Sequence, residues 1–412
     1  MAAEVSHEPK RWIRPTLGIV LILAAALAIS AFALKALPAP FVWIDLTWAC
    51  ALVAGLFCMH GPRRRWSLSC LRGEWFRPIL FHIAVALVAL ASAEAYFSLH
   101  YNGPALYSSA FYVLDDAMGA VPTSDAKVHA THKTFNVTYT IDSNGLRVTP
   151  PAQKEPHPGC ILFFGDSFTF GDGLQDNETL PYQVGLQSGG RYHAFNFGFE
   201  GYGPHQMLSA IETGRVRRVV DDCTPEYAFY GAITDHVRRA VGKVPYGKHG
   251  PRYVLDPDGT VRRDGNFEGL ERTYSPAETE LRWQFGKSAI YRLLADRPPR
   301  PTEDDVRTTL AIVRRSRDLL VEQYPEIKFE VIFWPDWNRD GDLSRELQDG
   351  FRELSIPVHR AEDVLPDFTP TSSEYSISYD NNHPNALANR ILANYVLTRI
   401  VAPESAVRAA SK

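Results

Sequence analysis

The chain has 412 residues, of which 45% are hydrophobic and 22% are charged, so its composition is that of a folded protein of two or three domains. The net charge of −4 is unevenly spread, because residues 1–100 carry nine Lys/Arg against five Asp/Glu and the remainder carries 34 against 42. This acidic remainder argues against a nucleic-acid partner. The five cysteines form no Cys-x-x-Cys pair and no cluster with histidine at zinc spacing, so we expect no metal site.

Three apolar stretches in the first 100 residues predict transmembrane helices at about residues 15–36, 41–60 and 78–99. The first includes an uncharged run from Leu17 to Leu34, which is close to the length that a bilayer core requires. The second and third each carry an acidic residue, Asp45 and Glu94. The alternatives are a cleaved signal peptide for the first stretch and buried core helices for the other two.

The basic residues around these stretches predict their orientation. Three precede the first stretch and five lie between the second and third, whereas only Lys35 lies between the first and second. The positive-inside rule then places the N-terminus and the arginine-rich loop in the cytoplasm. We therefore predict a multi-pass protein of the cytoplasmic (inner) membrane whose residues after about 100 are extracytoplasmic, as in a periplasmic domain.

The rest of the chain alternates between strand and helix patterns. Residues 101–155 form a linker with an entry hairpin, since an alternating segment is followed by the turn signal Asn144-Gly145. Continuous apolar runs then predict strands that are buried on both faces of a parallel sheet. These predicted strands are Cys160–Phe164, Tyr192–Phe197, Glu226–Tyr230 and Lys328–Trp334, and the predicted helices are Thr302–Gln323 and Pro384–Val401.

This alternation predicts an α/β domain over residues 156–405. A stretch rich in glycine and proline at about 241–283 interrupts it and is expected to be an insertion near the site, with a hairpin turn at residues 256–259.

Residues that carry chemistry follow the predicted strands. Ser167 lies in a Gly-Asp-Ser turn after the first strand, Gly201 follows the second, and Thr234 follows the third. Loops at the carboxyl ends of parallel strands meet at one edge of the sheet, where ligands bind. Asp380 and His383 precede the last helix, so a serine nucleophile, a histidine base and a carboxylate that orients the base are all available.

The segments Gly165–Phe168, the glycine block at Gly201, the block ending at Thr234-Asp235, and Asp380–His383 resemble blocks I, II, III and V of the SGNH/GDSL hydrolases, in the same order. The hairpin before the first strand is similar to that of a membrane-anchored branch of the family. The resemblance implies a three-layer α/β/α (flavodoxin-like) SGNH domain. It also implies a catalytic triad of Ser167, His383 and Asp380, and no metal ion or organic cofactor.

The resemblance further implies an oxyanion hole made by the main chain of Ser167 and Gly201 and by a side chain at Thr234. The family usually has asparagine at this last position, and threonine is shorter. The first and third strands are neighbours in the family, so Cys160 and Cys223, which precede them, are expected to form a disulfide in an oxidising compartment.

These features predict a membrane-anchored serine esterase that hydrolyses an acyl ester outside the cytoplasmic membrane. One alternative is an O-acyl (acetyl) transferase or deacetylase that acts on envelope polysaccharide. The other is a catalytically silent module that binds glycans. The expected partners are the membrane and an acyl ester substrate, of which an acylated envelope polysaccharide and a lipid are the two candidates.

Overall fold

The computed structural model describes residues 76–100, 105–152, 159–220, 222–244, 246–268, 288, 290, 300–334, 341–368, 374–378 and 381–401. The chain divides into two compact units. The first comprises Met1–Asn102 with Thr273–Arg297, and the second comprises Gly103–Arg272 with Pro298–Lys412.

In the first unit the structure describes one long helix, α3 (Phe76–His100), at the position of the third predicted span. Its Glu94 carboxylate accepts hydrogen bonds from Ser288 Oγ at 2.7 Å and Ile290 N at 3.1 Å. Across the described part of the chain, no helix has both the length and the apolar character that a membrane crossing requires. The first two predicted spans lie outside the described residues.

The second unit is built on a parallel sheet. Its five described strands are β6 (Gly159–Phe164), β7 (Tyr192–Asn196), β8 (Thr224–Ala232), β11 (Lys328–Phe333) and β12 (Val358–Arg360). They are arranged in the order β12-β11-β8-β6-β7, and every neighbouring pair is parallel. The α/β class and the four predicted strands are thus confirmed. The short strand β12 was not predicted, because Val358-His359-Arg360 contains no apolar run.

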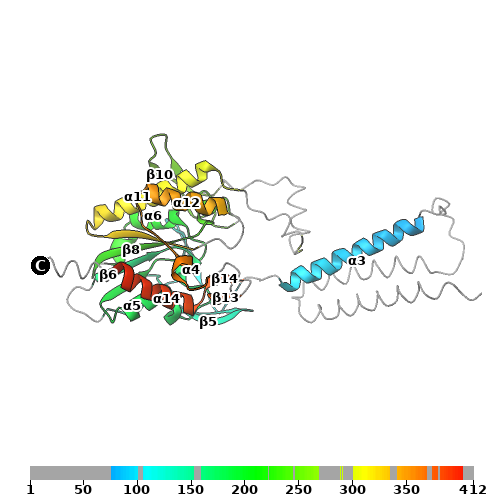
Figure 1. The fold of residues 1–412 in the computed structure, drawn as a ribbon, viewed down its shortest axis with the longest axis horizontal. Helices are drawn as coiled ribbons and strands as arrows, with labels where there is room; N and C mark the ends of the chain where they lie inside the picture. The colour runs from blue at the N-terminus through cyan, green and yellow to red at the C-terminus, as the bar shows by residue number, and fades with distance from the viewer. Residues whose placement is uncertain are drawn as a thin grey trace, which may run out of the picture. The chain divides into compact units, whose positions relative to one another are not determined.

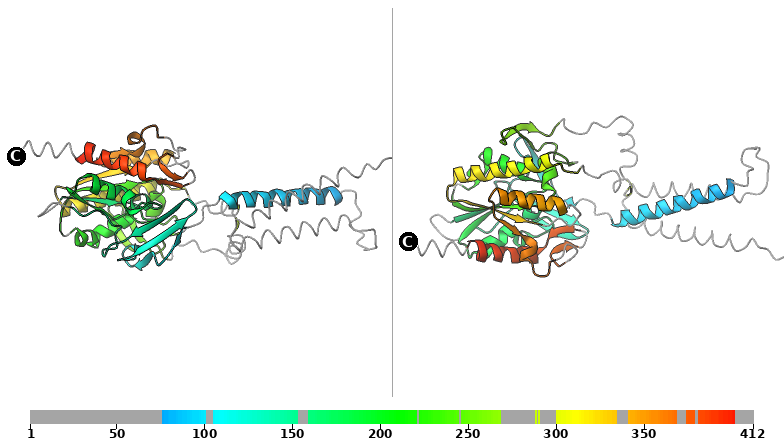
Figure 2. Two further views of the ribbon diagram at one scale, coloured as in Figure 1. Left: turned by 90° about the horizontal axis from the view of Figure 1, so that it is seen from below. Right: turned by 45° about the horizontal axis from the view of Figure 1, so that its top comes forward.

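Both faces of the sheet are buried, which explains why its strands are continuously apolar. Along β6, Leu162 and Phe164 enter one core cluster while Ile161 and Phe163 enter the other. The first cluster is covered by α6 (Pro204–Glu212), α11 (Glu303–Gln323) and α12 (Gly341–Glu353). The second is covered by α5 (Leu180–Gln187) and α14 (Ala386–Tyr395), so the unit has three layers (Figures 1 and 2).

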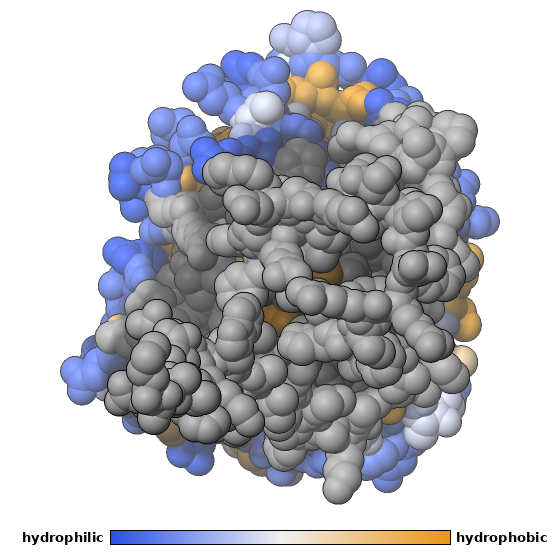
Figure 3. Space-filling model, turned by 90° about the vertical axis from the view of Figure 1, so that its right-hand side faces the viewer, coloured by the Kyte–Doolittle hydropathy of each residue, from blue (hydrophilic) through white to orange (hydrophobic). Residues whose placement is uncertain are grey.

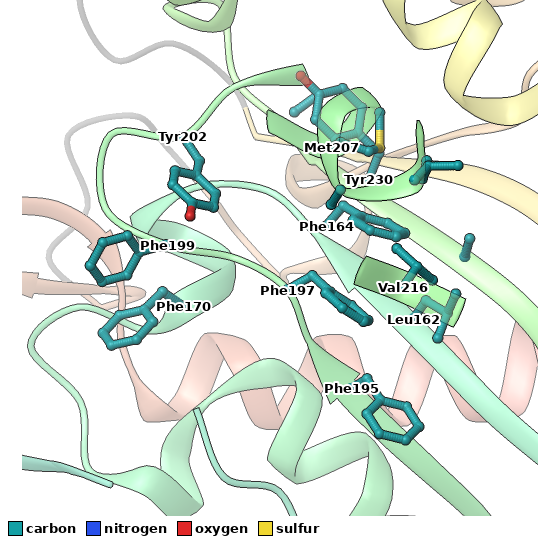
Figure 4. Packing of buried hydrophobic residues seen from close by; sticks show 14 of the residues in the cluster. Leu162, Phe164, Phe170, Phe195, Phe197, Phe199, Tyr202, Met207, Val216 and Tyr230 are labelled. Atoms are coloured by element: carbon teal, nitrogen blue, oxygen red, sulfur yellow. The ribbon is translucent and has the colours of Figure 1, made fainter. Parts of the chain in front are cut away.

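Aromatic rings fill much of the first cluster (Figure 4). Phe164 stacks on Phe197 at 5.1 Å between ring centroids, and Phe199 contacts Phe170 and Tyr202 edge to face at 5.5 and 5.4 Å. These rings come from β6 and from the segments that follow β6 and β7. Their packing therefore fixes the loops at the carboxyl ends of the two strands.

Antiparallel strands precede the sheet. They are β1 (Leu106–Tyr107), β2 (Tyr112–Asp115), β3 (Gly119–Pro122), β4 (Lys127–His132) and β5 (Phe135–Thr140). After β5 the predicted Asn144-Gly145 turn is present: Gly145 has φ +71°, and Ile141 pairs with Arg147 across the turn. Arg147 also pairs antiparallel with Asn196 of β7, so the hairpin is attached to the edge of the main sheet.

The predicted insertion contains the predicted hairpin. Strand β9 (Pro251–Leu255) pairs antiparallel with β10 (Val261–Asn266), and Asp256 N donates to Thr260 O across the turn. Residues 269–283 of the insertion lie outside the described part. On the face shown in Figure 3, the described residues along one edge are mostly hydrophilic, and an apolar patch lies at the top of the view.

The shorter elements of the second unit are α4 (Ser167–Phe170), η2 (Asp176–Glu178), α7 (Arg215–Val219), α8 (His236–Ala240), α13 (Ala361–Val364), β13 (Ser376–Ser378), β14 (Asn381–Pro384) and η3 (Val396–Val401).

The predicted start of the last helix is wrong. Pro384 ends β14, where it pairs with Ser376 of β13, and α14 begins at Ala386. The reason is that Asn385 is the N-cap: its side chain accepts a hydrogen bond from Ala388 N at 3.0 Å. His383 consequently lies on the short strand β14, and Asn385 separates this strand from the helix.

Cys160 and Cys223 form a disulfide with a Cα–Cα distance of 5.9 Å, which confirms the expected bridge. Cys160 is the second residue of β6 and Cys223 directly precedes β8, and these strands are neighbours in the sheet. The bridge closes a separation of 63 residues and ties the amino ends of the two strands together.

We predict that replacing both cysteines by alanine lowers the free energy of unfolding by about 4 kcal/mol, the chain-entropy value for a loop of this length. The melting temperature should fall by roughly 10 °C, measured by thermal unfolding of the full chain in detergent. A reducing agent should lower the melting temperature of the wild type but not of the double variant. Equal melting temperatures of the wild type and the double variant would contradict a stabilising bridge.

Candidate active site

Ser167 is placed at the carboxyl end of β6, an inner strand of the sheet between β8 and β7. It is the first residue of α4, and only Gly165 and Asp166 separate it from the strand. The Asp166 side chain caps this short helix by accepting a hydrogen bond from Phe168 N at 3.0 Å. Ser167 is only 9% exposed, so its hydroxyl lies in a confined environment.

Close backbone packing fixes the position of α4. Thr169 lies against the ends of β7 and β8, where a Cβ at Gly198 would come within 2.7 Å of Thr169 Cβ and a Cβ at Gly231 within 2.5 Å of Thr169 Oγ1. Only glycine permits both approaches. Gly198 and Gly231 therefore allow α4, the helix that begins with Ser167, to pack closely against the ends of β7 and β8.

His383 is brought to Ser167 from 216 residues away in sequence. Its Nε2 lies 2.8 Å from Ser167 Oγ, within hydrogen-bond distance. The His383 ring packs against Phe168 at 4.8 Å between centroids, and Phe168 meets Trp334 edge to face at 5.7 Å. The structure thus unites two members of the predicted triad, while Asp380 lies outside the described residues.

The surroundings of His383 favour its neutral form. Burial lowers the pKa of His383 below the ordinary value; Asp172 and Asp166 act in the opposite direction, and the positive charge of Arg239 adds to the lowering. A neutral imidazole can accept a proton at Nε2, as a general base must.

The other predicted site residues lie in loops at the same edge of the sheet. Gly201 has φ +73° in the turn between β7 and α6, and its Cβ position is 3.3 Å from the ring of Tyr246. Thr234 follows β8 and is 1% exposed, and its carbonyl accepts from Val237 N at 3.1 Å. Because β6, β7 and β8 are adjacent, the three predicted oxyanion loops are neighbours. Their roles as donors remain a prediction.

A buried arginine holds the loop after α4. Arg147 Nη1 donates to the carbonyls of Phe170 at 3.0 Å and Gly171 at 2.5 Å, and Nη2 donates to Leu174 O at 2.5 Å. Its guanidinium also pairs with Asp176 at 3.2 Å and lies over two aromatic rings. The sequence gives no reason to single out Arg147, because a lone arginine after a turn shows no sign of burial.

A pair of acidic side chains near the site was also missed. Tyr139 Oη donates to Asp172 at 2.6 Å, and Tyr107 Oη donates to Glu200 at 2.8 Å. Burial, together with the adjacent charge of Asp172, raises the pKa of Glu200 to about 8. Glu200 is therefore mostly protonated near neutral pH. In sequence the two acids are 28 positions apart, and nothing marks them as neighbours.

Within the described part of the chain, no group of three or more His, Cys, Asp or Glu side chains is arranged to hold a metal ion. The expectation of a site without metal remains a prediction.

Comparison with protein-family models and with curated proteins finds no match to this chain. Solved structures do match it at low identity. A putative lipolytic protein of the G-D-S-L family from Desulfitobacterium hafniense is 14% identical, with 57% of this chain and 97% of that chain covered and a TM-score of 0.31.

Two further matches are described as carbohydrate esterases. The acetyl xylan esterase Est2A from Butyrivibrio proteoclasticus is 11% identical over 60% of this chain and 65% of that chain, with a TM-score of 0.33. A carbohydrate acetylesterase family member from Sinorhizobium meliloti is 10% identical over 58% and 95%, with a TM-score of 0.31.

The motifs that resemble those of the SGNH/GDSL hydrolases come together in the fold of this chain. Three of the four lie at the carboxyl ends of adjacent parallel strands. The hydrogen bond between Ser167 and His383 joins the first motif to the last. Ser167 and His383 therefore form a candidate serine hydrolase site at this edge of the sheet.

Proposed function

We propose that this protein hydrolyses an acyl ester, with Ser167 as the nucleophile and His383 as the general base. The observation that carries the proposal is the 2.8 Å contact between Ser167 Oγ and His383 Nε2. A serine hydroxyl is a weak nucleophile until a base takes its proton, and His383 has both the position and the lowered pKa for this role.

In the proposed first step, Ser167 Oγ attacks the ester carbonyl carbon while its proton moves to His383 Nε2. The negative charge that develops on the carbonyl oxygen is stabilised by the main-chain N–H groups of Ser167 and Gly201 and by the Thr234 hydroxyl. Collapse of the tetrahedral intermediate releases the alcohol, which takes the proton from His383. Asp380 is proposed to hold the imidazole in the tautomer that these transfers require.

In the second step, water loses a proton to His383 and attacks the acyl-serine carbonyl carbon. The new tetrahedral intermediate then collapses: the bond to Ser167 Oγ breaks, this oxygen takes the proton back from His383, and the carboxylic acid is released. If a glycan hydroxyl replaces this water, the same intermediate yields acyl transfer. The burial of Ser167, and the packing of the adjacent Phe168 against Trp334, favour a small acyl group such as acetyl.

We further propose that the hydrolase domain acts outside the cytoplasmic membrane, on an ester of the cell envelope. The support lies in the sequence, where the three apolar stretches and the distribution of arginines agree on one orientation. The disulfide between Cys160 and Cys223 fits an oxidising compartment.

The experiment that tests the function measures hydrolysis of p-nitrophenyl esters from acetyl to dodecanoyl by the full-length chain and by Ser167→Ala, with and without a glycan acceptor. We expect turnover that depends on Ser167 and is highest for acetyl. Formation of acylated glycan when the acceptor is present would show that the protein transfers the acyl group instead of hydrolysing the ester. The absence of turnover, together with no labelling of Ser167 by a fluorophosphonate, would leave the glycan-binding alternative.

The serine mechanism predicts losses that do not add. Ser167→Ala and His383→Ala should each lower kcat by several orders of magnitude, and the double variant should be scarcely worse, because the two residues act in one step. Asp380→Asn should be milder, since the imidazole still reaches a usable orientation part of the time. Steady-state kinetics of variants with wild-type melting temperatures check this. Additive losses would mean that the two residues do not share a step.

The lowered pKa of His383 predicts the pH dependence. The base works only when neutral, so activity should be lost as the pH falls through the pKa of His383. Because burial lowers this pKa, the acid limb of kcat/KM should lie below about 6.5, the ordinary value for histidine. A pH–rate profile with the acetyl ester measures the limb. A midpoint above 7 would show that the acidic neighbours outweigh burial.

The charge distribution predicts the topology. A periplasmic reporter fused after residue 105 should be active, and one fused within Arg63–Arg72 should be inactive. The same fusions with a cytoplasmic reporter should give the opposite pattern. An active cytoplasmic reporter at residue 105 would place the hydrolase domain inside the cell.

A further inference from the structure

A buried guanidinium connects the three loops around the site. Arg239 lies in α8 (His236–Ala240) and is 9% exposed. Its Nη1 donates to Asp166 Oδ2 at 2.9 Å and to the carbonyl of Tyr202 at 2.8 Å. Its Nε donates to Asp235 Oδ2 at 3.0 Å. One side chain thus binds a segment after β6, a segment after β7 and a segment after β8.

Each bonded residue is the sequence neighbour of a predicted oxyanion donor. Asp166 directly precedes Ser167, and Tyr202 directly follows Gly201. Asp235 directly follows Thr234. A shift of any of these three hydrogen bonds would therefore move one predicted donor relative to the other two. Catalytic contributions of this kind fall steeply when donors are misplaced by about 1 Å.

The surroundings of this cluster stabilise the ionised forms of Asp166 and Arg239. Asp166 is fully buried, and although burial opposes its ionisation, His236, Arg239 and the Phe168 N–H lower the pKa of Asp166 below its usual range. The nearby Asp166 and Asp235 carboxylates raise the pKa of Arg239 despite its burial. The ring of Tyr246 covers the guanidinium at 6.0 Å from its centroid. Buried ion pairs of this kind are costly to break on one side only, because the remaining charge loses its partner.

We propose that Arg239 is a positioning residue. It holds the three predicted oxyanion loops in fixed positions relative to one another and places a positive charge beside the site. The proposal rests on the proposed function. It gives a reason why a short threonine is tolerated where the family usually has asparagine: the loop that carries Thr234 is tied through Asp235 to the same guanidinium that orients the other two donors.

The positive charge has a consequence for His383. The charged groups that act on this ring are Asp172 and Asp166, which favour its protonated form, and Arg239, which disfavours it. Removing Arg239 deletes the opposing charge and leaves Asp166 without its cation. Both effects have the same sign, so His383 should become easier to protonate.

The test compares Arg239→Gln and Arg239→Lys with Arg238→Gln, a matched control on the adjacent residue. Replacement of Arg238 removes the same charge. Of the three residues that Arg239 binds, Arg238 pairs in the described structure with Asp235, at 3.4 Å. We expect Arg239→Gln to lower kcat for the acetyl ester by about 10²–10³-fold, the range for loss of an oxyanion donor, with KM changed less than about threefold. Arg238→Gln should stay within about threefold of the wild type.

The two variants at Arg239 separate geometry from charge. Arg239→Lys keeps the charge but lacks the planar fork, so it should lose about tenfold in kcat while its acid limb stays at the wild-type pH. Arg239→Gln should move the acid limb to higher pH. If Arg239→Gln does not fold, Arg239→Lys decides the matter, because wild-type kcat in that variant would overturn the positioning role. Equal losses in Arg238→Gln and Arg239→Gln would overturn it as well.

A second measurement does not depend on turnover. The pKa of His383, followed by NMR of the imidazole in the full-length chain, should rise in Arg239→Gln and stay unchanged in Arg238→Gln. If the wild type hydrolyses no ester, the proposed function fails while this titration still tests the coupling of Arg239 to His383. An unchanged titration in a folded Arg239→Gln variant would refute the coupling.

Discussion

The buried carboxylate of Asp166 is the group on which the arrangement of the site depends. It caps the helix that begins with Ser167, pairs with Arg239 at 2.9 Å, and lies 3.3 Å from His236 Nε2 without a well-directed hydrogen bond. A fully buried charge persists only when such partners surround it. Because Asp166 needs these partners, α4 and α8 lie close together. Their contact in turn fixes the loops next to both helices.

The parallel sheet brings the loops of the site together at one edge. Carboxyl ends of adjacent parallel strands share one edge, so the loops after β6, β7 and β8 meet although they span about 70 residues of sequence. His383 reaches the same edge from β14, because Asn385 caps α14 and leaves the histidine on an extended segment before the helix. The fold thus fixes the positions of both Ser167 and His383, and with them the distance between the two side chains.

The elements that the sequence predicts well are those whose signal is local. Continuous apolar runs predicted the strands, the helix predicted over Thr302–Gln323 matches α11 within one residue, and the Asn144-Gly145 turn is present, since each depends on neighbouring residues. The triad pair was found because its motifs belong to a family pattern. Arg147 and Arg239 were missed for a physical reason: a charged side chain in sequence looks solvated, and only its tertiary partners show that it is buried.

The charges around His383 show why the missed residues matter for the chemistry. Asp166 and Asp172 favour the protonated, inactive form of the imidazole, and Arg239 disfavours it. Burial is the largest effect and lowers the pKa of His383, so the ring is held in the neutral form that a general base requires. The base is thus set by residues from three separate segments of the chain, and Asp166, Asp172 and Arg239 all lie outside the predicted triad.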